Sequence, residues 1–418
     1  MNKFFVLLTF LALPSSTHAD HLILRDALTL AIHNDPGLRS ADLETRARGY
    51  TEKKDLAGYM PKLTLSLSHT LTPTFKTSTS ARIDQTIFRA DGPAAHAAIS
   101  RKYKELSELD KELKEDQLRL KTETAFIAAW LKQEERNLVK AKLKSARHVC
   151  ELAKGKFDLG MSHKSDWLTS KSAHQKTIAE VNEYNNALAT KIANLEAYTG
   201  SLLIERKKCE NGIGFERYPL IDFDPKANIE LADLNSYLEV SLKNRKDIIA
   251  KSIEAKRQQL TENLYHKGNL PRASFTGTAE KPLNVSHSTD TIYSAGIAVT
   301  WNVFDQLSNH FDASAAKART TKAILEKEKI IRTAKSEVTA VHRTLGATLR
   351  TLHEKKHEVT AAQSAFELAQ SKFELGMLSA ADFTTAEKTW QTTNFAWLTL
   401  AAEAHTEYSE LMSVCGYP

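Results

Sequence analysis

The sequence predicts a mainly α-helical protein with two β-hairpins, built from two copies of one unit: helix, hairpin, long helix, return helix. Three observations predict this fold class. A long motif occurs twice, apolar residues recur every seven positions over two long stretches, and polar and apolar residues alternate over short stretches. Each unit spans roughly 185 residues, far more than the ~20 to 50 residues of a solenoid repeat, so the pattern indicates a duplicated architecture.

The duplicated motif is Lys-Phe-Asp-Leu-Gly-Met at 156–161, and it returns as Lys-Phe-Glu-Leu-Gly-Met at 372–377, 216 positions later. An aspartate follows each copy, Asp166 in the first and Asp382 in the second. Glycine permits the left-handed or tight backbone with which a long helix can reverse its direction. We therefore expect a turn at the glycine of each motif, followed by a return helix.

The first nineteen residues have the pattern of a secretory signal peptide. A positive start at Lys3 is followed by an apolar run and then by small residues before Asp20. About 10 apolar residues are too few for a transmembrane helix, which needs ~20. We expect residues 1–19 to be removed and the mature chain to leave the cytoplasm. Asp20 at the new N-terminus, in place of cysteine, argues against a lipid anchor.

The first repeat is expected to cover residues 20–200. Its elements should be a short helix at about 24–58, strands at about 62–72 and 80–88, a long helix at about 93–159 and a return helix at about 166–198. Residues 201–230 contain several prolines and glycines, which favours an inter-repeat linker.

The second repeat is expected to cover residues 231–418. Its elements should be a short helix at about 235–267, strands at about 271–281 and 291–304, a long helix at about 309–375 and a return helix at about 382–412. The second hairpin is predicted to carry six extra residues, because Pro61 matches Pro271 at an offset of 210 whereas Phe88 matches Phe304 at 216.

The two long helices are predicted from their length without proline and from an apolar residue at every seventh position. In the second copy this series runs Ile324, Ile331, Val338, Leu345, Leu352, Val359, Phe366 and Phe373. A seven-residue series keeps one apolar seam facing a partner helix, as in a coiled coil. At ~1.5 Å per residue each helix would be on the order of 100 Å long. A rod of this length is too long for a compact domain.

The strands before each long helix are predicted from alternation. Leu63, Leu65 and Leu67 alternate with Thr64, Ser66 and Ser68. One polar and one apolar face over ~10 residues, with aromatic residues near the ends, is typical of outer-membrane strands. An ordinary soluble two-stranded ribbon would show the same alternation. Four strands cannot close a barrel, and an open edge in lipid leaves backbone groups without partners, so several copies of the chain would have to share one barrel.

Composition argues against nucleic-acid binding. The formal net charge is +6, with 57 basic and 51 acidic residues that are interleaved along the helices. No basic cluster with intervening aromatic residues is present. The sequence leaves open whether Cys209 and Cys415 form a disulfide.

One zinc-like motif, His353-Glu354-Lys355-Lys356-His357, matches H-E-x-x-H, in which two histidines bind metal and the glutamate acts as a base. It lies inside the apolar seven-residue series, and the equivalent segment of the first copy, 137–141, has none of this chemistry. We therefore expect neither an enzyme, nor a metal site, nor a cofactor.

The ordered set of these features resembles the TolC-like outer-membrane efflux proteins (outer membrane factors). The resemblance covers nearly the whole mature chain. It rests on Asn34-Asp35-Pro36-Gly37-Leu38, on Pro61 at the entry to the first strand, and on the doubled Lys-Phe-x-x-Gly turns. It implies a homotrimer with a 12-stranded β-barrel, four strands per chain, on a long α-helical tunnel. The protein would lie in the outer membrane of a Gram-negative bacterium and extend into the periplasm.

The resemblance also implies a function. The chain would be the exit duct of a tripartite efflux pump or type I secretion system, passively conducting substrates from an inner-membrane transporter and its periplasmic adaptor. The alternative from the residues alone is a soluble periplasmic coiled-coil scaffold or adaptor. The exported substrate is not encoded in these features.

The resemblance assigns two sets of site residues. The turns would be where the adaptor docks, through Lys156, Phe157, Gly160, Met161, Lys372, Phe373, Gly376 and Met377. The periplasmic aperture would be formed by Asp166, Asp382, Thr385, Phe373 and Leu378. Family members are similar in having an acidic ring at the place of Asp382 and a latch aspartate at that of Asp166. Simple capping of a helix N-terminus explains both aspartates equally well.

This chain departs from the family's aperture at three positions. Thr385 stands where a second ring aspartate can occur, Phe373 where a latch tyrosine can, and Leu378 where a latch arginine can. The sequence therefore predicts a mouth with a weaker polar latch and a reduced cation-binding ring, and charged rings of this kind control which ions pass a pore.

Overall fold

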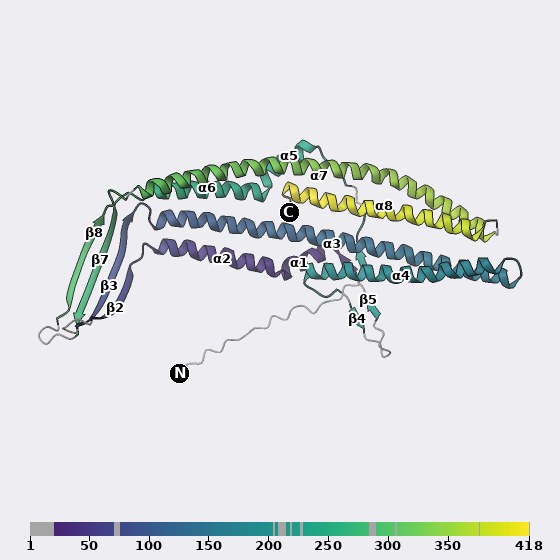
Figure 1. Ribbon diagram of the computed structural model, residues 1–418, viewed down its shortest axis with the longest axis horizontal. Helices are drawn as coiled ribbons and strands as arrows, with labels where there is room; N and C mark the ends of the chain where they lie inside the picture. Colours follow the sequence, from purple (N-terminus) through teal and green to yellow (C-terminus); the bar gives the residue numbers. More distant parts are fainter. Residues whose placement is uncertain are drawn as a thin grey trace. The chain divides into compact units, whose positions relative to one another are not determined.

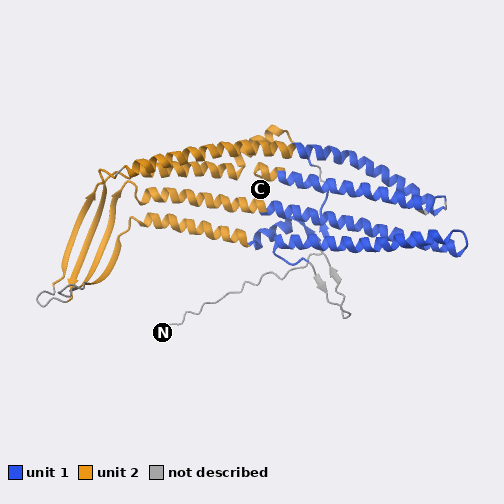
Figure 2. Cartoon of the chain, viewed as in Figure 1, with its two compact units in different colours: residues 1–35, 118–231, 343–410 blue, residues 36–117, 232–342, 411–418 orange. Residues whose placement is uncertain are grey.

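The computed structural model describes residues 21–70, 76–203, 205–207, 215–217, 220–225, 229–283, 290–305, 307–375 and 377–417. The predicted signal peptide, Cys209 and Gly376 lie outside the described residues. The chain divides into two compact units (Figure 2). Unit 1 consists of residues 1–35, 118–231 and 343–410, and unit 2 of residues 36–117, 232–342 and 411–418.

The elements of the two repeats follow one another in the same order (Figure 1). The first repeat contains α1 (Leu24–Asn34), α2 (Pro36–Ala57), β2 (Lys62–Thr70), β3 (Lys76–Arg89), α3 (Pro93–Asp158) and α4 (Lys164–Thr199). The second contains α5 (Leu234–Asn244), α6 (Lys246–His266), β7 (Arg272–Pro282), β8 (Ile292–Thr300), α7 (Ser308–Glu374) and α8 (Ala380–Cys415). The predicted fold class, mainly helical with four strands in a duplicated helix, hairpin, long helix, helix unit, is confirmed.

The short first helix of each repeat is broken, where the sequence predicted one continuous helix. Asp35 has φ −63° and ψ 119° at the end of α1, because a residue before proline is driven out of the α region. Arg245, at the end of α5, has nearly the same backbone conformation, with φ −60° and ψ 116°, although no proline follows it. Its guanidinium is fixed by ion pairs to Asp247 and to Glu337, both at 2.7 Å.

Each break is the place where the return helix of the same repeat ends. Gly200 caps α4 in a left-handed conformation, with φ 63°, and a Cβ at this position would meet the Cβ of Asn34 at 2.9 Å. Gly416 has φ 77° after α8, and its Cβ would meet the backbone of Asn244 at 2.9 Å. Glycine is thus required at both positions for its backbone and for the close approach.

Part of the inter-repeat segment is ordered, although its composition predicted only a linker. It contains β4 (Glu205–Lys207), β5 (Phe215–Arg217) and β6 (Leu220–Asp222). β4 and β5 pair antiparallel, and β6 pairs in parallel with β1 (His21–Ile23). The buried side chain of Gln133 both donates to and accepts from the backbone of Ile221, at 2.9 Å each, and so holds β6 against α3.

The apolar core of unit 1 gathers residues from β1, α1, α3, α4, β6 and α8. Its largest members are Phe126, Trp130, Leu188, Ile192, Leu195, Ile221 and Leu398. The ring of Phe223, just after β6, packs edge-on against Trp130 at 5.2 Å and against His405 at 4.8 Å. At the end of α8, in unit 2, burial raises the pKa of the free Cys415 thiol to about 11, so this thiol stays protonated.

Unit 2 contains one four-stranded antiparallel sheet in the order β2-β3-β7-β8 (Figure 1). β3 and β7 form the centre and β2 and β8 the two edges. The last strand ends at Thr300, earlier than the predicted end at about 304. Thr300 pairs with Arg272, the first residue of β7, and Pro271 before it has no N–H to donate to a longer ladder.

No helix within the described ranges is both long enough and apolar enough to cross a bilayer.

Candidate functional site

The sheet has one polar face. Its cross-strand register places Lys62, Asp84 and Thr276 in one row, and Thr64, Arg82, Thr278 and Ser294 in the next. Hydroxyl groups bond across the strands, Ser66 to Ser80 and Ser68 to Ser78, both at 2.8 Å. Asp84 accepts from Arg82 at 2.8 Å and from Thr276 at 3.2 Å. This face is therefore suited to water.

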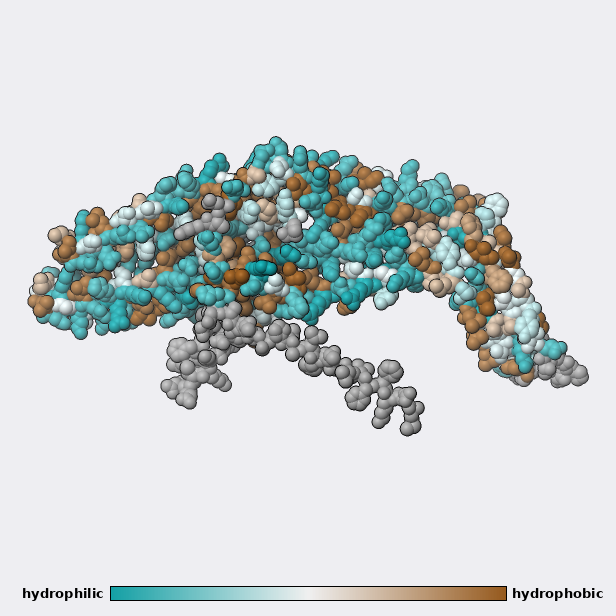
Figure 3. Space-filling model, turned by 180° about the vertical axis from the view of Figure 1, so that it is seen from behind, coloured by the Kyte–Doolittle hydropathy of each residue, from teal (hydrophilic) through white to brown (hydrophobic). Residues whose placement is uncertain are grey.

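The opposite face of the sheet is mostly apolar and exposed. Leu65 and Leu67 of β2 are 73% and 71% exposed, and Ile297 and Val299 of β8 are each 69% exposed. Between them the same face carries mainly small or apolar residues of β3 and β7, such as Ala81 and Ala279. Figure 3 shows hydrophobic residues over the sheet and the neighbouring helix ends. A contiguous apolar surface of this kind marks a contact with lipid or protein.

A charged group lies at the end of the polar face next to the helices. Arg89 and Arg272 are paired directly across β3 and β7, and both contact Asp91, at 3.0 Å and 3.2 Å. Two guanidinium groups share one carboxylate, so this group carries a net positive charge. The hydrogen bonds and charge of Arg89 lower the pKa of Asp91 and outweigh the effect of its partial burial.

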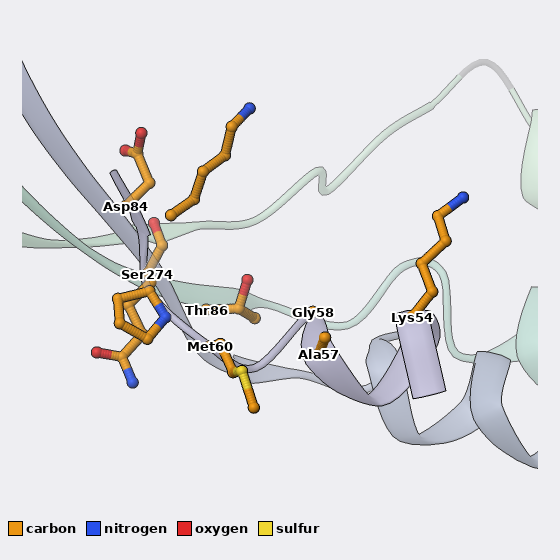
Figure 4. A pocket seen from close by; sticks show the side chains of 10 residues that line it. Lys54, Ala57, Gly58, Met60, Asp84, Thr86 and Ser274 are labelled. Atoms are coloured by element: carbon orange, nitrogen blue, oxygen red, sulfur yellow. The ribbon is translucent and has the colours of Figure 1, made fainter. Parts of the chain in front are cut away.

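An opening of about 540 Å³ lies where α2 meets the polar face. Figure 4 shows Lys54 and Ala57 from α2 beside Asp84 and Thr86 from β3 and Ser274 from β7. The lining mixes one carboxylate, lysines and hydroxyl groups. This composition provides neither a nucleophile with its base nor a set of metal ligands, so we regard the opening as part of the polar surface.

The first predicted turn joins α3 to α4 in unit 1. Gly160 has φ 72°, and the amide of Met161 donates to the carbonyl of Lys156 at 2.8 Å, which closes the end of α3. The ring of Phe157 stacks on Trp167 at 5.8 Å, and both rings are half-buried. Met161 is 74% exposed.

The second predicted turn joins α7 to α8 and is closed by the same bond, from the amide of Met377 to the carbonyl of Lys372 at 2.8 Å. Phe373 stacks on Phe383 at 4.9 Å, but here the two side chains are only 6% and 3% exposed. Met377 is 75% exposed. The two turns therefore have the same closing hydrogen bond and a ring pair at matching positions, in different surroundings.

The buried ring pair belongs to a cluster that joins the two helical hairpins. Its members are Val149 and Leu152 of α3, Phe366 and Phe373 of α7, Leu378 of the turn, and Phe383 of α8. Trp390 extends the cluster by stacking on Phe366 at 5.1 Å. The ammonium of Lys156 in α3 lies over the Phe373 ring, 5.4 Å from its centre. We call this set of residues the aromatic clasp.

Of the predicted aperture residues, Phe373 and Leu378 meet in the aromatic clasp, whereas Asp166, Asp382 and Thr385 are exposed on α4 and α8. Asp382 forms a reciprocal cap with Ser379: its amide donates to the Ser379 hydroxyl at 3.1 Å, and that hydroxyl donates back to its carboxylate at 2.7 Å. The N-cap of α4, His163, makes no side-chain capping bond, and Asp166 lies in the first turn of that helix, where the helix dipole favours a negative charge. The helix N-terminus therefore accounts for both aspartates, with a side-chain cap at Asp382.

A buried carboxyl group lies on the same helix as Asp382. Glu387 of α8 is 5% exposed and accepts a hydrogen bond from Ser145 of α3. Burial raises the pKa of Glu387, and the Ser145 bond and the charge of Lys142 oppose that rise only in part. Lys142 itself pairs with Glu180 at 2.7 Å.

The zinc-like motif is not assembled into a site. His353 and His357 are exposed on α7 with their rings 5.1 Å apart, and Lys355 pairs with Glu358 at 2.5 Å. Within the described residues no group of three or more His, Cys, Asp or Glu side chains could hold a metal ion.

Sequence reasoning placed Phe366 and Phe373 in the apolar seam of the long helix but missed Phe383 and Trp390 of the aromatic clasp. The repeat offset was the signal that could have found them, because Phe383 stands 216 positions after Trp167. Their burial against α3 depends on packing between the two repeats, which no local pattern reports.

Comparison with solved structures identifies the fold. The chain superimposes on CusC, studied for its folding and transmembrane channel formation, with a TM-score of 0.77 at 14% identity over 94% of this chain and 92% of that chain. The outer membrane channel CmeC of Campylobacter jejuni superimposes with a TM-score of 0.72 at 16% identity, over 94% of this chain and 85% of that chain. VceC, an outer membrane protein of Vibrio cholerae, superimposes with a TM-score of 0.72 at 14% identity, over 94% of this chain and 96% of that chain.

Comparison of sequences identifies the family. No protein with a curated description matches the chain significantly. The profile of the outer membrane efflux protein family matches residues 27–201 and 237–417, one segment in each repeat. These segments contain both helical hairpins and all four strands of the sheet. The chain therefore belongs to the outer membrane efflux protein family.

Proposed function

We propose that the chain is the exit duct of a tripartite efflux pump or type I secretion system in a Gram-negative outer membrane. Three copies would form one 12-stranded barrel and a helical tunnel that extends into the periplasm. The duct would conduct substrates passively from an inner-membrane transporter and a periplasmic adaptor. The observation that carries this proposal is the sheet, which has one polar and one apolar face and whose edge strands, β2 and β8, are each paired on one side only within the described residues.

The physical argument concerns these edges. A sheet in lipid must have every backbone group paired, so β2 of one copy would pair with β8 of the next until the barrel closes. The apolar face of Leu65 and Ile297 would then contact lipid, and the hydroxyl-rich face of Ser66 and Ser80 would line the lumen. A soluble scaffold would leave the apolar face in water, and the family match does not favour that alternative.

The turns are proposed as the adaptor-docking surface. Leu159 and Met161 of the first turn are 76% and 74% exposed, and Leu375 and Met377 of the second are 71% and 75% exposed. Exposed apolar side chains flanked by charged ones such as Lys372 suit a protein partner. Phe373 would support this surface from inside, because its ring is buried in the aromatic clasp.

The aperture is proposed to contain Asp166 and Asp382 as its acidic groups, with Thr385 on the same helix as Asp382. The latch would be the aromatic clasp, in which Phe373 and Leu378 replace a polar contact by an apolar one. Substitution D166N should then lower the single-channel selectivity for cations. D382N should do the same but also weaken the cap with Ser379.

The first test is the mass of the full-length protein extracted from the outer membrane in mild detergent. A stable trimer supports the duct. A monomer or dimer recovered from the periplasm without detergent would overturn it. Docking is tested separately by crosslinking to the adaptor, where the double variant M161S/M377S should reduce the yield while the trimer persists.

A further inference from the structure

The helix-side end of the polar face holds more cations than carboxylates. Asp84 accepts two hydrogen bonds from Arg82, at 2.8 Å and 2.9 Å. Asp91 accepts two from Arg89, both at 3.0 Å. Each carboxylate is therefore neutralised by one guanidinium group. Three further cations of this region have no carboxylate of their own within the described ranges: Lys54, Lys62 and Arg272.

Arg272 is the surplus guanidinium of this region. Its side chain makes one polar contact within the described residues, from a terminal nitrogen to Asp91 at 3.2 Å, and it is 41% exposed. Arg89 already fixes Asp91, and like charges directly opposite each other on two strands are unfavourable. A guanidinium has several N–H donors in a planar fork, which suits a carboxylate or a phosphate. Most donors of Arg272 are therefore available to a further anion.

A β-bulge in β3 brings Arg89 onto the polar face. Strict alternation from Thr86, which lies on this face, would put Phe88 there too and Arg89 on the apolar face. The register shifts between Thr86 and Phe88, so Arg89 pairs instead with Arg272. One extra residue in a strand reverses the faces of those that follow it, and bulges of this kind re-aim side chains next to functional sites. The strand thus departs from regular pairing where the cations gather.

Both repeats place a basic residue at the start of their first strand. Lys62 follows Pro61 and begins β2, and Arg272 follows Pro271 and begins β7, 210 positions later. Proline has no N–H with which to extend the ladder, so each strand begins at the basic residue. Lysine in one repeat and arginine in the other have the positive charge in common.

Hydroxyl groups lie beside these cations. Thr86 and Ser274 are opposite each other across β3 and β7, and the next row on the polar face is Arg89 and Arg272. Figure 4 shows the hydroxyls of Thr86 and Ser274 directed to the same side of the sheet. Together with Lys62 they line the opening of about 540 Å³, a volume typical of sites for small organic molecules.

We propose that this end of the polar face is an anion-binding site for the phosphate or carboxylate group of an exported small molecule. Lys54, Lys62 and Arg272 would supply the charge, and the hydroxyls of Thr86 and Ser274 would donate hydrogen bonds. The inference rests on the proposed function, in which the polar face lines the lumen and three copies repeat the site around it. Rings of lysine and arginine are a device by which pores favour anions. The substrate class is therefore small organic anions.

Binding is tested on the purified full-length protein in detergent. Calorimetric titration at low salt should show binding of adenosine monophosphate, whereas adenosine, which lacks the phosphate, should not bind. R272Q and K62Q should each weaken binding about tenfold or more, the usual strength of a hydrogen bond to a charged group. R272Q leaves the Arg89–Asp91 pair in place. The matched control K281Q removes a charge from the opposite face of β7 and should leave binding unchanged.

Three results would overturn the inference. Adenosine that binds as tightly as adenosine monophosphate would show that the phosphate is not recognised. Unchanged binding in the double variant K62Q/R272Q would place the anion elsewhere. In planar bilayers adenosine monophosphate should reduce the single-channel current. A reduction seen in phosphatidylcholine but absent in phosphatidylglycerol would show that a lipid headgroup occupies the site.

The mass measurement proposed above tests the duct separately. A monomer that binds adenosine monophosphate would overturn the duct, and with it the role of the site in export. A conducting trimer that does not bind adenosine monophosphate would overturn the anion site alone.

Discussion

The two helical turns of unit 1 share a sequence motif and a closing hydrogen bond, yet only the second is packed into a core. Phe157 and Trp167 stack in the first turn and remain half-buried, whereas Phe373 and Phe383 stack in the second and are 6% and 3% exposed. The difference follows from their neighbours, because α3 places Val149 and Leu152 against the second pair. The duplicated motif thus specifies the turn at the end of each long helix, and contacts between the repeats determine which turn is buried in a core.

Neighbouring substitutions reinforce the same difference. At the repeat offset, Phe366 replaces Cys150, Leu378 replaces Ser162 and Trp390 replaces His174. Each of these changes adds an apolar group to the second copy at a position that belongs to or borders the aromatic clasp. Every residue of the second turn therefore has a matched control 216 positions earlier.

The largest expected effect is that of Phe383→Ala. Removing a fully buried ring costs about 3–5 kcal/mol, from lost burial and the cavity left behind. The control Trp167→Ala removes a half-buried ring and should cost roughly 1 kcal/mol. Guanidinium unfolding of the detergent-solubilised protein, followed by helical circular dichroism, measures both. Equal losses in the two variants would contradict the distinction between the turns.

A smaller effect is expected at the start of the return helices. Ser379→Ala removes the reciprocal cap of α8 and should lower the free energy of unfolding by about 1 kcal/mol. His163→Ala at the start of α4 should change the free energy of unfolding by about a few tenths of a kcal/mol at most, because the His163 side chain makes no capping bond. The same unfolding measurement compares the two variants. A larger loss of stability in His163→Ala than in Ser379→Ala would show that the caps are assigned wrongly.

The sequence predicted much of this region and missed a part with a clear physical reason. The motif spacing located both turns, and the seven-residue series placed Phe373 in a buried seam, because these depend on neighbours along one helix. Phe383 and Glu387 were missed, because their burial depends on α3 of the other repeat. The break at Asp35 could have been predicted from Pro36, but no proline follows Arg245, so the sequence carries no comparable signal for the matching break.

Glu387 should make stability depend on pH. The folded state raises its pKa from an ordinary value of 4.5, so the folded protein binds this proton more tightly than the unfolded chain. Its contribution to stability therefore decreases as pH rises from about 4.5 through the folded pKa, and it is recovered on acidification. Glu387→Gln should raise the melting temperature at neutral pH and flatten the profile. Lys171→Gln, the exposed equivalent, should leave the profile unchanged.

The smallest effect is expected at Lys156, whose ammonium lies over the Phe373 ring. Lys156→Gln should cost about 0.5–1 kcal/mol, the usual strength of an exposed cation–π contact. Its equivalent Lys372 is exposed, and no ring contact is recorded for it, so Lys372→Gln serves as the control. A double-mutant cycle with Phe373→Leu isolates the contact, and a coupling energy of zero would remove Lys156 from the aromatic clasp.

Because of the open edges of the sheet, the assembly of this protein should depend on how much of it the cell makes. In the described part of a single chain, the outer edges of β2 and β8 have no strand partner and lie beside an apolar surface, and such edges pair readily with any available strand. Where identical chains must meet before the ladders close, correct assembly competes with aggregation and depends on concentration. Newly exported chains, which have not yet assembled, would then depend most on chaperones. Overproduction would increase misassembly rather than the number of channels.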